Sequence, residues 1–270
     1  MWVLSLDTTT RAGSVALASD GRVIEETAGS ATQPPAARLP GDLMAILSRH
    51  GLAVQDIDLY AVATGPGSFT GLRIGIATMQ GVAFATRKPL IGVSGLDALA
   101  RVAAQVARRD EAGASHIATW VDAWRGEAYA ALYEVLDSAR SGAPRRAVDE
   151  SLNEARDEAT REVLPPTVDT PAALLAAVRS LSVTRPSCST LFIGDGAESY
   201  RDLITSTLGT AAAFPASLTP ALAGAIAILA WHAARGGLRP PPHAIRPLYV
   251  RRPDAELARS RARGLAAPTR

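Results

Sequence analysis

The chain has 270 residues, of which 47% are hydrophobic, and its 28 basic residues nearly balance its 26 acidic ones. The single cysteine, Cys188, excludes an internal disulfide and favours a reducing compartment. The sequence shows neither a secretory leader pattern nor an apolar run long enough to span a bilayer. We therefore expect a cytoplasmic protein that does not enter a membrane.

Charge is distributed unevenly along the chain. Residues 235–270 carry nine arginines against Asp254 and Glu256, a net charge of +7, so the preceding 234 residues carry −5. This basic end could contact RNA phosphates or an acidic partner, although a solvated tail is the commoner outcome for such a terminal run.

The first half of the chain alternates strand and helix patterns, with an Asp-Gly hairpin turn near its start. We expect strands at 2–6, 14–18, 23–27, 59–63 and 90–93, and helices at 39–49, 72–86 and 96–108.

The second half repeats the opening frame. A strand at 117–121 ends in Asp122 and returns through a glycine-containing turn, as the strand ending in Asp7 does. This indicates an internal duplication at a spacing of about 115 residues. The other expected elements are a polar excursion at 137–166, a helix at 171–180, a strand at 191–194 with a Gly194-Asp195-Gly196 turn, and helices at 199–208 and 220–234.

The most informative stretch is the glycine-rich loop 65–75, which joins a strand to a helix. Its glycines allow close approach of another surface, and Ser68 or Thr70 can cap the helix. Free N–H groups at such a helix start favour an anion or a partner's carboxylate. The loop has no lysine and so is not a Walker A motif.

A strand that ends in Asp7-Thr8-Thr9 and returns as a hairpin suits phosphate handling, since hydroxyls and amides bind phosphate oxygens and the carboxylate can hold Mg²⁺. With its second copy, the chain resembles the actin-like ATPase superfamily, a two-lobed α/β fold of duplicated ribonuclease H-like units. This resemblance implies a cleft, in this chain a vestigial nucleotide site, formed by Asp7, Thr8, Thr9, Asp122, Gly194 and Gly196.

Several motifs in order resemble the bacterial TsaB (YeaZ) family. They are Leu6–Thr9, Ser14–Leu17, loop 65–75, Ile91–Ser94, Val121–Tyr129 and Pro247–Arg251. The resemblance implies a non-catalytic subunit for tRNA N6-threonylcarbamoyladenosine formation, which supports the catalytic paralogue TsaD together with the ATPase TsaE. It also implies a homodimer when the chain is alone, tRNA contact only through the complex, and ATP and Mg²⁺ held by the partners.

The expected domain division follows from the same resemblance. One lobe covers 1–109 and is joined by a C-terminal helix at 219–235, a shorter lobe covers 110–218, and a basic, partly extended tail covers 236–270.

Motifs for catalysis are missing from the sequence. The catalytic paralogue holds a metal through His-x-x-x-His on one helix face, whereas His50, His116, His232 and His243 lie far apart here. Ser68 has no general base in a nearby motif, and the lone cysteine is expected to be buried. We therefore expect no catalytic residue and no metal, and we reject the older glycoprotease label for this family. Asp7 and Asp122 could flank a Mg-nucleotide or simply accept turn amides, and the second role is favoured.

A partner surface is the favoured working part. Glycine inside a helix costs about 1 kcal/mol relative to alanine, so the glycines after the loop need a reason: close approach of a partner helix, or packing on the chain's own sheet. The expected interface residues are Leu39, Leu43, Ser68, Phe69, Thr70, Gly71, Arg73, Ile74, Gly75, Thr78, Met79 and Val82. The alternatives are an active nucleotide-dependent kinase or transferase of the same superfamily, and an RNA-binding module based on the basic end with Tyr249.

Overall fold

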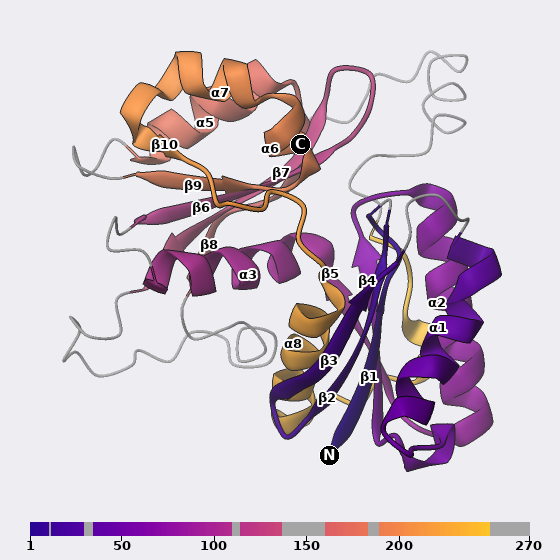
Figure 1. Cartoon of the computed structure of the whole chain (residues 1–270). Coiled ribbons are helices and arrows are strands. Elements are labelled where there is room, and N and C mark those ends of the chain that lie inside the picture. The colour runs from indigo at the N-terminus through magenta and orange to yellow at the C-terminus, as the bar shows by residue number, and fades with distance from the viewer. Residues whose placement is uncertain (11, 30–34, 110–113, 137–159, 183–188, 249–270) are drawn as a thin grey trace.

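The computed structural model describes the chain except for residues 11, 30–34, 110–113, 137–159, 183–188 and 249–270. Two five-stranded sheets are separated and covered by helices (Figure 1). The first sheet contains β1 (Trp2–Asp7), β2 (Ser14–Ser19), β3 (Arg22–Ala28), β4 (Leu59–Gly65) and β5 (Leu90–Ser94), and the second contains β6 (His116–Asp122), β7 (Ala128–Val135), β8 (Thr160–Asp169), β9 (Thr190–Ile193) and β10 (Ala212–Ala213). The helices are α1 (Pro35–Arg49), α2 (Phe69–Thr86), α3 (Gly95–Arg109), α5 (Pro171–Ser182), α6 (Asp195–Ser199), α7 (Arg201–Leu208) and α8 (Ala223–Arg235), with short 3₁₀ turns at Val54–Asp56, Gly209–Ala211 and Pro242–Ala244.

The two sheets have the same topology. The first runs β3-β2-β1-β4-β5 and the second β8-β7-β6-β9-β10, with the hairpin strands antiparallel and the other neighbours parallel in both. Asp7 pairs with Ser14 and Asp122 with Ala128, each at the last rung of its hairpin. The predicted duplication, and with it the two-lobed actin-like α/β fold, is confirmed.

Side-chain alternation along the strands sets the layers. Leu4 and Leu6 face α1 and α2, whereas Val3 faces the opposite side, where α3 and α8 lie. In the second sheet, Ile117 faces that same middle layer, and Trp120 faces the outer helix α5. The order is therefore α1/α2, first sheet, α8/α3, second sheet, α5/α7 (Figure 1).

Helix α8, the last α-helix among the described residues, is fixed onto the first sheet at its N-terminus. The Ser14 hydroxyl accepts the Ala223 amide at 2.9 Å, and the Glu26 carboxylate accepts the Gly224 amide at 2.8 Å. These contacts satisfy N–H groups that a helix start leaves without an intrahelical partner. We propose that α8 belongs to the first lobe, and the domain limits given above stay a prediction.

Two sequence expectations in the second half were wrong. The excursion expected up to residue 166 ends earlier, because residues 160–169 form the edge strand β8. Pro165 and Pro166 fall where the β7–β8 register shifts, and edge strands and bulges tolerate proline. The prediction of a turn at Gly194-Asp195-Gly196 was also wrong in part, since helix α6 already begins at Asp195.

Among the described helices, none is both long and apolar enough to cross a membrane. Cys188 and the part of the basic tail from residue 249 onward lie outside the described residues.

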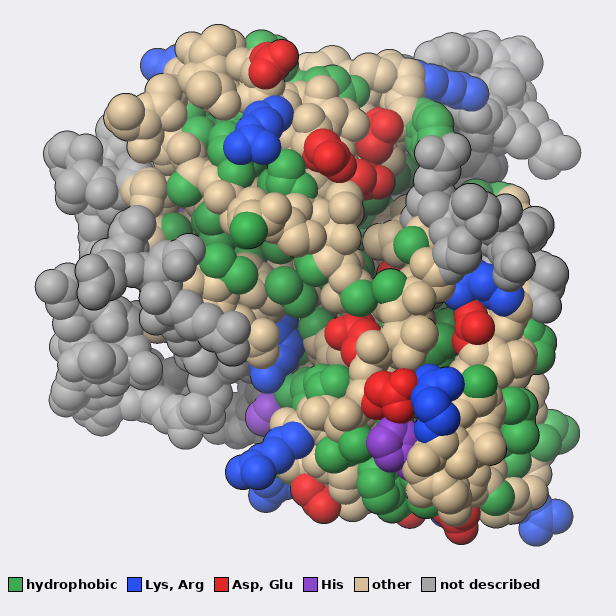
Figure 2. Space-filling view, viewed as in Figure 1, with side chains coloured by type: hydrophobic (Ala, Val, Ile, Leu, Met, Phe, Trp, Pro, Cys, Tyr) green, Lys and Arg blue, Asp and Glu red, His purple; other side chains and the backbone are tan. Residues whose placement is uncertain are grey.

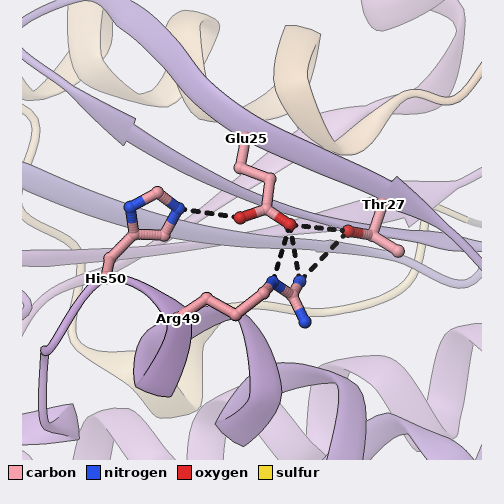
Figure 3. Close-up of polar contacts among 4 residues, drawn as sticks. All are labelled: Glu25, Thr27, Arg49 and His50. Atoms are coloured by element: carbon pink, nitrogen blue, oxygen red, sulfur yellow. Dashed lines mark hydrogen bonds and ion pairs between the residues drawn. The ribbon is translucent and has the colours of Figure 1, made fainter.

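A surface cluster joins the exposed edge strand β3 to the end of α1 (Figure 3). Glu25 accepts hydrogen bonds from Arg49 Nε at 3.0 Å and Nη2 at 2.6 Å, and its other oxygen lies 2.7 Å from His50 Nε2. These hydrogen bonds, that of Arg49 first, lower the pKa of Glu25 from 4.5 to about 2.

We expect Glu25→Gln to lower the melting temperature at neutral pH. Because the pKa of Glu25 is depressed in the folded state, its stabilisation is present above 4.5 and is lost as the pH falls towards about 2. Thermal unfolding of variant and wild type across that range should therefore converge at the acid end, and salt should shrink their difference. Arg49→Gln should remove the same pH-dependent part, and a double variant that loses the sum of both effects would contradict the pairing.

Candidate functional site

The first candidate element is the turn between β1 and β2. Asp7 is buried at the end of β1, and its Oδ1 accepts the Thr9 amide at 2.8 Å and the Thr9 hydroxyl at 2.6 Å. Its Oδ2 accepts the Thr10 hydroxyl at 2.9 Å. Burial raises the pKa of Asp7, and these hydrogen bonds oppose the rise. The carboxylate oxygens are thus engaged within the turn, which supports the structural role of Asp7.

The glycine-rich loop packs directly on this turn. A Cβ at Gly67 would lie 2.7 Å from Thr9 Cβ, and a Cβ at Gly71 or Gly75 would overlap the Thr8 carbonyl or hydroxyl oxygen. Ser68 caps α2 by accepting the Gly71 amide at 3.2 Å, as the sequence predicted. The first turn of α2 therefore lies against Thr8 and Thr9 with no side chain between them.

Thr8 is enclosed by this contact. It is almost fully buried, and its hydroxyl oxygen has no hydrogen-bond partner among the described residues. The Cγ2 methyl of Thr8 would lie 3.0 Å from a Cβ at Gly75, so the Thr8 side chain faces the backbone of α2.

The second candidate turn joins β6 to β7. Asp122 Oδ1 accepts the Trp124 amide at 2.8 Å, and Trp124 and Arg125 both have φ of 60°. Such backbone angles are unfavourable for bulky residues, and the Trp124 side chain is 74% exposed at the turn. Asp122 thus also accepts a turn amide, as Asp7 does.

Helix α6 approaches this second turn through its own glycines. A Cβ at Gly194 would overlap the Trp120 carbonyl oxygen, and one at Gly196 would lie 3.0 Å from Trp120 C. Asp195 Oδ1 accepts the Asp122 amide at 2.9 Å. Desolvation raises the pKa of Asp195, and the charge of Asp122 adds to the rise. Gly194 and Gly196, predicted as nucleotide-binding residues, have a packing role here.

Acidic side chains gather on the visible face around α6 (Figure 2), where Asp195 and Glu198 occupy its first turn. Within the described ranges, no three His, Cys, Asp or Glu side chains are grouped so that they could hold a metal ion. A vestigial nucleotide site at the two turns stays a prediction.

The roles of two residues near the first turn, Arg38 and Glu26, were not predicted from the sequence. The buried Arg38 of α1 donates to the Ala12 carbonyl and pairs with Asp42 at 2.6 Å, which ties α1 to the β1–β2 turn. Burial raises the pKa of Glu26, and the nearby Asp7 charge contributes to that rise. The i,i+4 spacing of Arg38 and Asp42 on a helix would have predicted their ion pair. Nothing in the local sequence indicates that Glu26 contacts α8.

The predicted interface residues divide into three groups by exposure. Ser68, Phe69, Thr70 and Arg73 are exposed. Ile74, Thr78 and Val82 are half-buried. Leu39, Leu43, Gly71, Gly75 and Met79 are buried. The buried group packs within the chain itself, Leu39, Leu43 and Met79 in the core beneath α1 and α2, so these side chains do not form a surface that a partner could contact. Glycines occur on both sides of α2, so the sequence alone does not distinguish the inner face of this helix from its outer face.

The exposed residues of α1, with those of α2 as far as Gly81, form a surface that is here called the α1–α2 face. On α2, exposed Arg73, Ala77 and Gly81 follow one another at helical spacing, and a Cβ at Gly81 would meet nothing within 4 Å. At one end Arg73 stacks on Phe69, with 3.9 Å between its guanidinium carbon and the ring centroid. On α1 the exposed residues include Gly41, Met44, Ala45 and Ser48, with Pro40 and Arg49 beside them.

The family of the chain follows from comparison with known proteins. A family model described as "TsaD: tRNA N6-adenosine threonylcarbamoyltransferase" matches residues 31–259. The chain belongs to this TsaD family.

The individual relatives of this TsaD-family chain include TsaB proteins. It is 39% identical over 137 residues to the tRNA threonylcarbamoyladenosine biosynthesis protein TsaB of Escherichia coli (strain K12), covering 50% of this chain and 55% of that protein. To TsaB of Bacillus subtilis (strain 168) it is 30% identical over 138 residues, covering 50% and 56%. The chain thus spans about half the length of the curated relatives it matches.

A solved structure extends the likeness over nearly the whole TsaD-family chain. YeaZ from Pseudomonas aeruginosa superposes with a TM-score of 0.66 at 27% identity, covering 92% of this chain and 99% of that one. A crystal structure described as similar to peptidase YEAZ, from the same organism, gives a TM-score of 0.67 at 28% identity, covering 93% and 99%. The resemblance to TsaB (YeaZ) drawn from the sequence is confirmed.

Gly75→Ala and Gly81→Ala are a matched pair that tests the two faces of α2. We expect Gly75→Ala to lower the free energy of unfolding by about 1–3 kcal/mol, because its methyl group would overlap the Thr8 hydroxyl. Gly81→Ala should raise it by up to about 1 kcal/mol, since its methyl group enters open space and alanine favours the helix. Urea unfolding measures both, and equal effects at the two positions would contradict the assignment of inner and outer faces.

Proposed function

We propose that this chain is a non-catalytic docking subunit in tRNA N6-threonylcarbamoyladenosine biosynthesis. Its partners would be a TsaD-like catalytic subunit, joined through the α1–α2 face, and a TsaE-like ATPase, with tRNA contacted through the assembly. When the partner is missing, the same face would pair two copies of this chain. The name of the TsaB relatives supports the pathway, and the TsaD family model supports a paralogous partner.

One observation carries the proposal. The residues that would handle phosphate and metal are engaged with the chain itself: Asp7 with Thr9 and Thr10, and Asp122 with the Trp124 amide. The α2 glycines that a phosphate loop would use contact Thr8 and Thr9 instead. The α1–α2 face is available to a partner, and its small exposed residues Gly41, Ala77 and Gly81 allow close approach of two helices.

Charge placed on this face should break the assembly while leaving the fold intact. We expect Ala77→Glu to weaken binding to the TsaD-family catalytic paralogue of the same host at least tenfold, about 1.4 kcal/mol, because a buried unpaired carboxylate is unfavourable. Gly81→Leu should act alike by steric exclusion, since Gly81 is exposed and a Cβ there meets nothing within 4 Å. Sedimentation of mixtures measures both.

The matched control for this experiment is Ala176→Glu, which adds the same charge to an exposed position of α5 on the other half of the molecule. It should bind the paralogue as the wild type does. Unchanged binding by both Ala77→Glu and Gly81→Leu would remove the α1–α2 face from the proposal. Gly75→Leu would be unsuitable as an interface probe, because its side chain would overlap Thr8.

The alternative, an active nucleotide-dependent kinase or transferase, predicts turnover by the isolated chain. We expect no appreciable ATP hydrolysis by purified protein in the presence of Mg²⁺. Asp7→Asn is the diagnostic variant, since asparagine keeps an oxygen acceptor for the Thr9 amide, whereas alanine would leave that buried amide without a partner. Hydrolysis by the wild type that disappears in Asp7→Asn would favour the alternative.

A further inference from the structure

A groove outside the turns and the α1–α2 face lies at the C-terminal end of α2. A segment at 239–248, here called the strap, runs back over the first lobe and forms one wall. The groove has a volume of about 640 Å³, within the range of about 300–1,000 Å³ typical of ligand sites. The residues that matter for its chemistry are Phe84, Arg87, Lys88, Arg239, Pro240 and Pro242.

The strap wall is held in place by specific contacts. Gln80 Nε2 of α2 donates to the carbonyls of Pro242 at 2.9 Å and Ile245 at 3.0 Å. The Leu248 amide donates to the Thr64 carbonyl at 2.7 Å. Three consecutive prolines at 240–242 restrict the backbone further. The groove is therefore preorganised, which lowers the entropic cost of binding.

Among the described residues, the cationic side chains of the groove form no close ion pair with a carboxylate. Lys88 Nζ lies 3.8 Å from Asp58 Oδ1, and the Arg239 guanidinium donates to the carbonyls of Ala234 and Leu238. Arg87 is the left-handed residue that ends α2, at φ 56°, a position that favours glycine. An arginine there retains a positive charge at the groove despite an unfavourable backbone angle.

An aromatic ring stands beside these cations. The Phe84 side chain is 81% exposed, and with Pro240 and Pro242 it gives the groove flat apolar surfaces. Cations along a groove with an exposed ring for base stacking are the features of single-strand nucleic-acid sites. The chain's own residues from 249 onward are an unsuitable occupant, because they carry six arginines against Asp254 and Glu256 and would be repelled.

We propose that this groove binds a single-stranded RNA segment, with phosphates on Arg87, Lys88 and Arg239 and one base against Phe84. The choice of RNA over another polyanion rests on the proposed role in tRNA modification, and the groove would be this chain's own contribution to the tRNA contact that the assembly makes. The site adjoins the α1–α2 face, because Phe84 lies one helical turn beyond Gly81 on the same side of α2.

Fluorescence anisotropy with a labelled ten-nucleotide oligoadenylate RNA and the full chain tests this. Phe84→Ala and Arg87→Gly should each weaken binding about fivefold or more, and Arg87→Gly should reduce the slope of log K against log salt by about 0.7. Arg87→Gly should also raise the melting temperature, because glycine relieves the left-handed angle, so lost binding could not reflect misfolding.

Arg179→Gln, which removes one exposed charge from α5, is the control and should bind as the wild type does. All variants keep residues 249–270, so any contact by that basic end is common to them.

Several results would overturn the inference. Equal weakening by Arg179→Gln, or none by Phe84→Ala, would indicate general attraction to positive charge. Displacement of the RNA by AMP at equal nucleotide concentration would assign the groove to a free nucleotide, and equal displacement by a ten-residue polyglutamate would assign it to an acidic protein segment. Ala77→Glu should bind the RNA normally and Arg87→Gly should still bind the paralogue, so failure of docking and failure of this site are separable.

Discussion

The close approach of α2 to the β1–β2 turn is the contact on which the first lobe depends. Gly67, Gly71 and Gly75 leave room for the backbone and side chains of Thr8 and Thr9. Within the turn, the Thr9 amide and the Thr9 and Thr10 hydroxyls donate hydrogen bonds to the buried Asp7 carboxylate. Since even one methyl group at Gly75 would enter the space of Thr8, α2 can lie this close to the turn only with its glycine-bearing side facing inward, and its other side therefore faces outward.

The second lobe repeats this constraint with different chemistry. Gly194 and Gly196 bring α6 against the end of β6 as the α2 glycines bring α2 against the first turn. Where the first lobe offers threonine hydroxyls, the second places Asp195 beside Asp122, and their proximity contributes to the raised pKa of Asp195. Carboxylates lie at both turns, Asp7 at the first and Asp122 with Asp195 at the second, so an anionic ligand without a metal ion would meet like charge at each. Because Asp7 and Asp122 accept hydrogen bonds within their own turns, the arrangement supports the proposed docking function.

The sequence predicted the fold well because its signals are local and repeated. A strand ending in aspartate, a glycine-containing turn and a return strand occur twice, and both sheets follow from that frame. The prolines at 165 and 166 hid β8, since local preference cannot show that a strand lies at an edge with a shifted register. Roles of single residues were harder to predict. Leu39 and Met79 are apolar residues of the kind found in interfaces, yet they lie in the core. Whether such a residue is buried depends on which face of its helix packs on the sheet, and the local sequence does not show this.

Gly75 and Gly81 illustrate what decides function in this chain. They lie on one helix and are alike in sequence, but one contacts Thr8 and the other meets open space. Because the inner face is fixed by the turn, the outer face and the C-terminal end of α2 belong to one rigid element. A surface that needs no reordering before it binds loses less entropy on association. Docking on the outer face and RNA contact at the helix end would then have a fixed geometry relative to each other, so a partner bound at one would be held at a constant distance from a strand bound at the other.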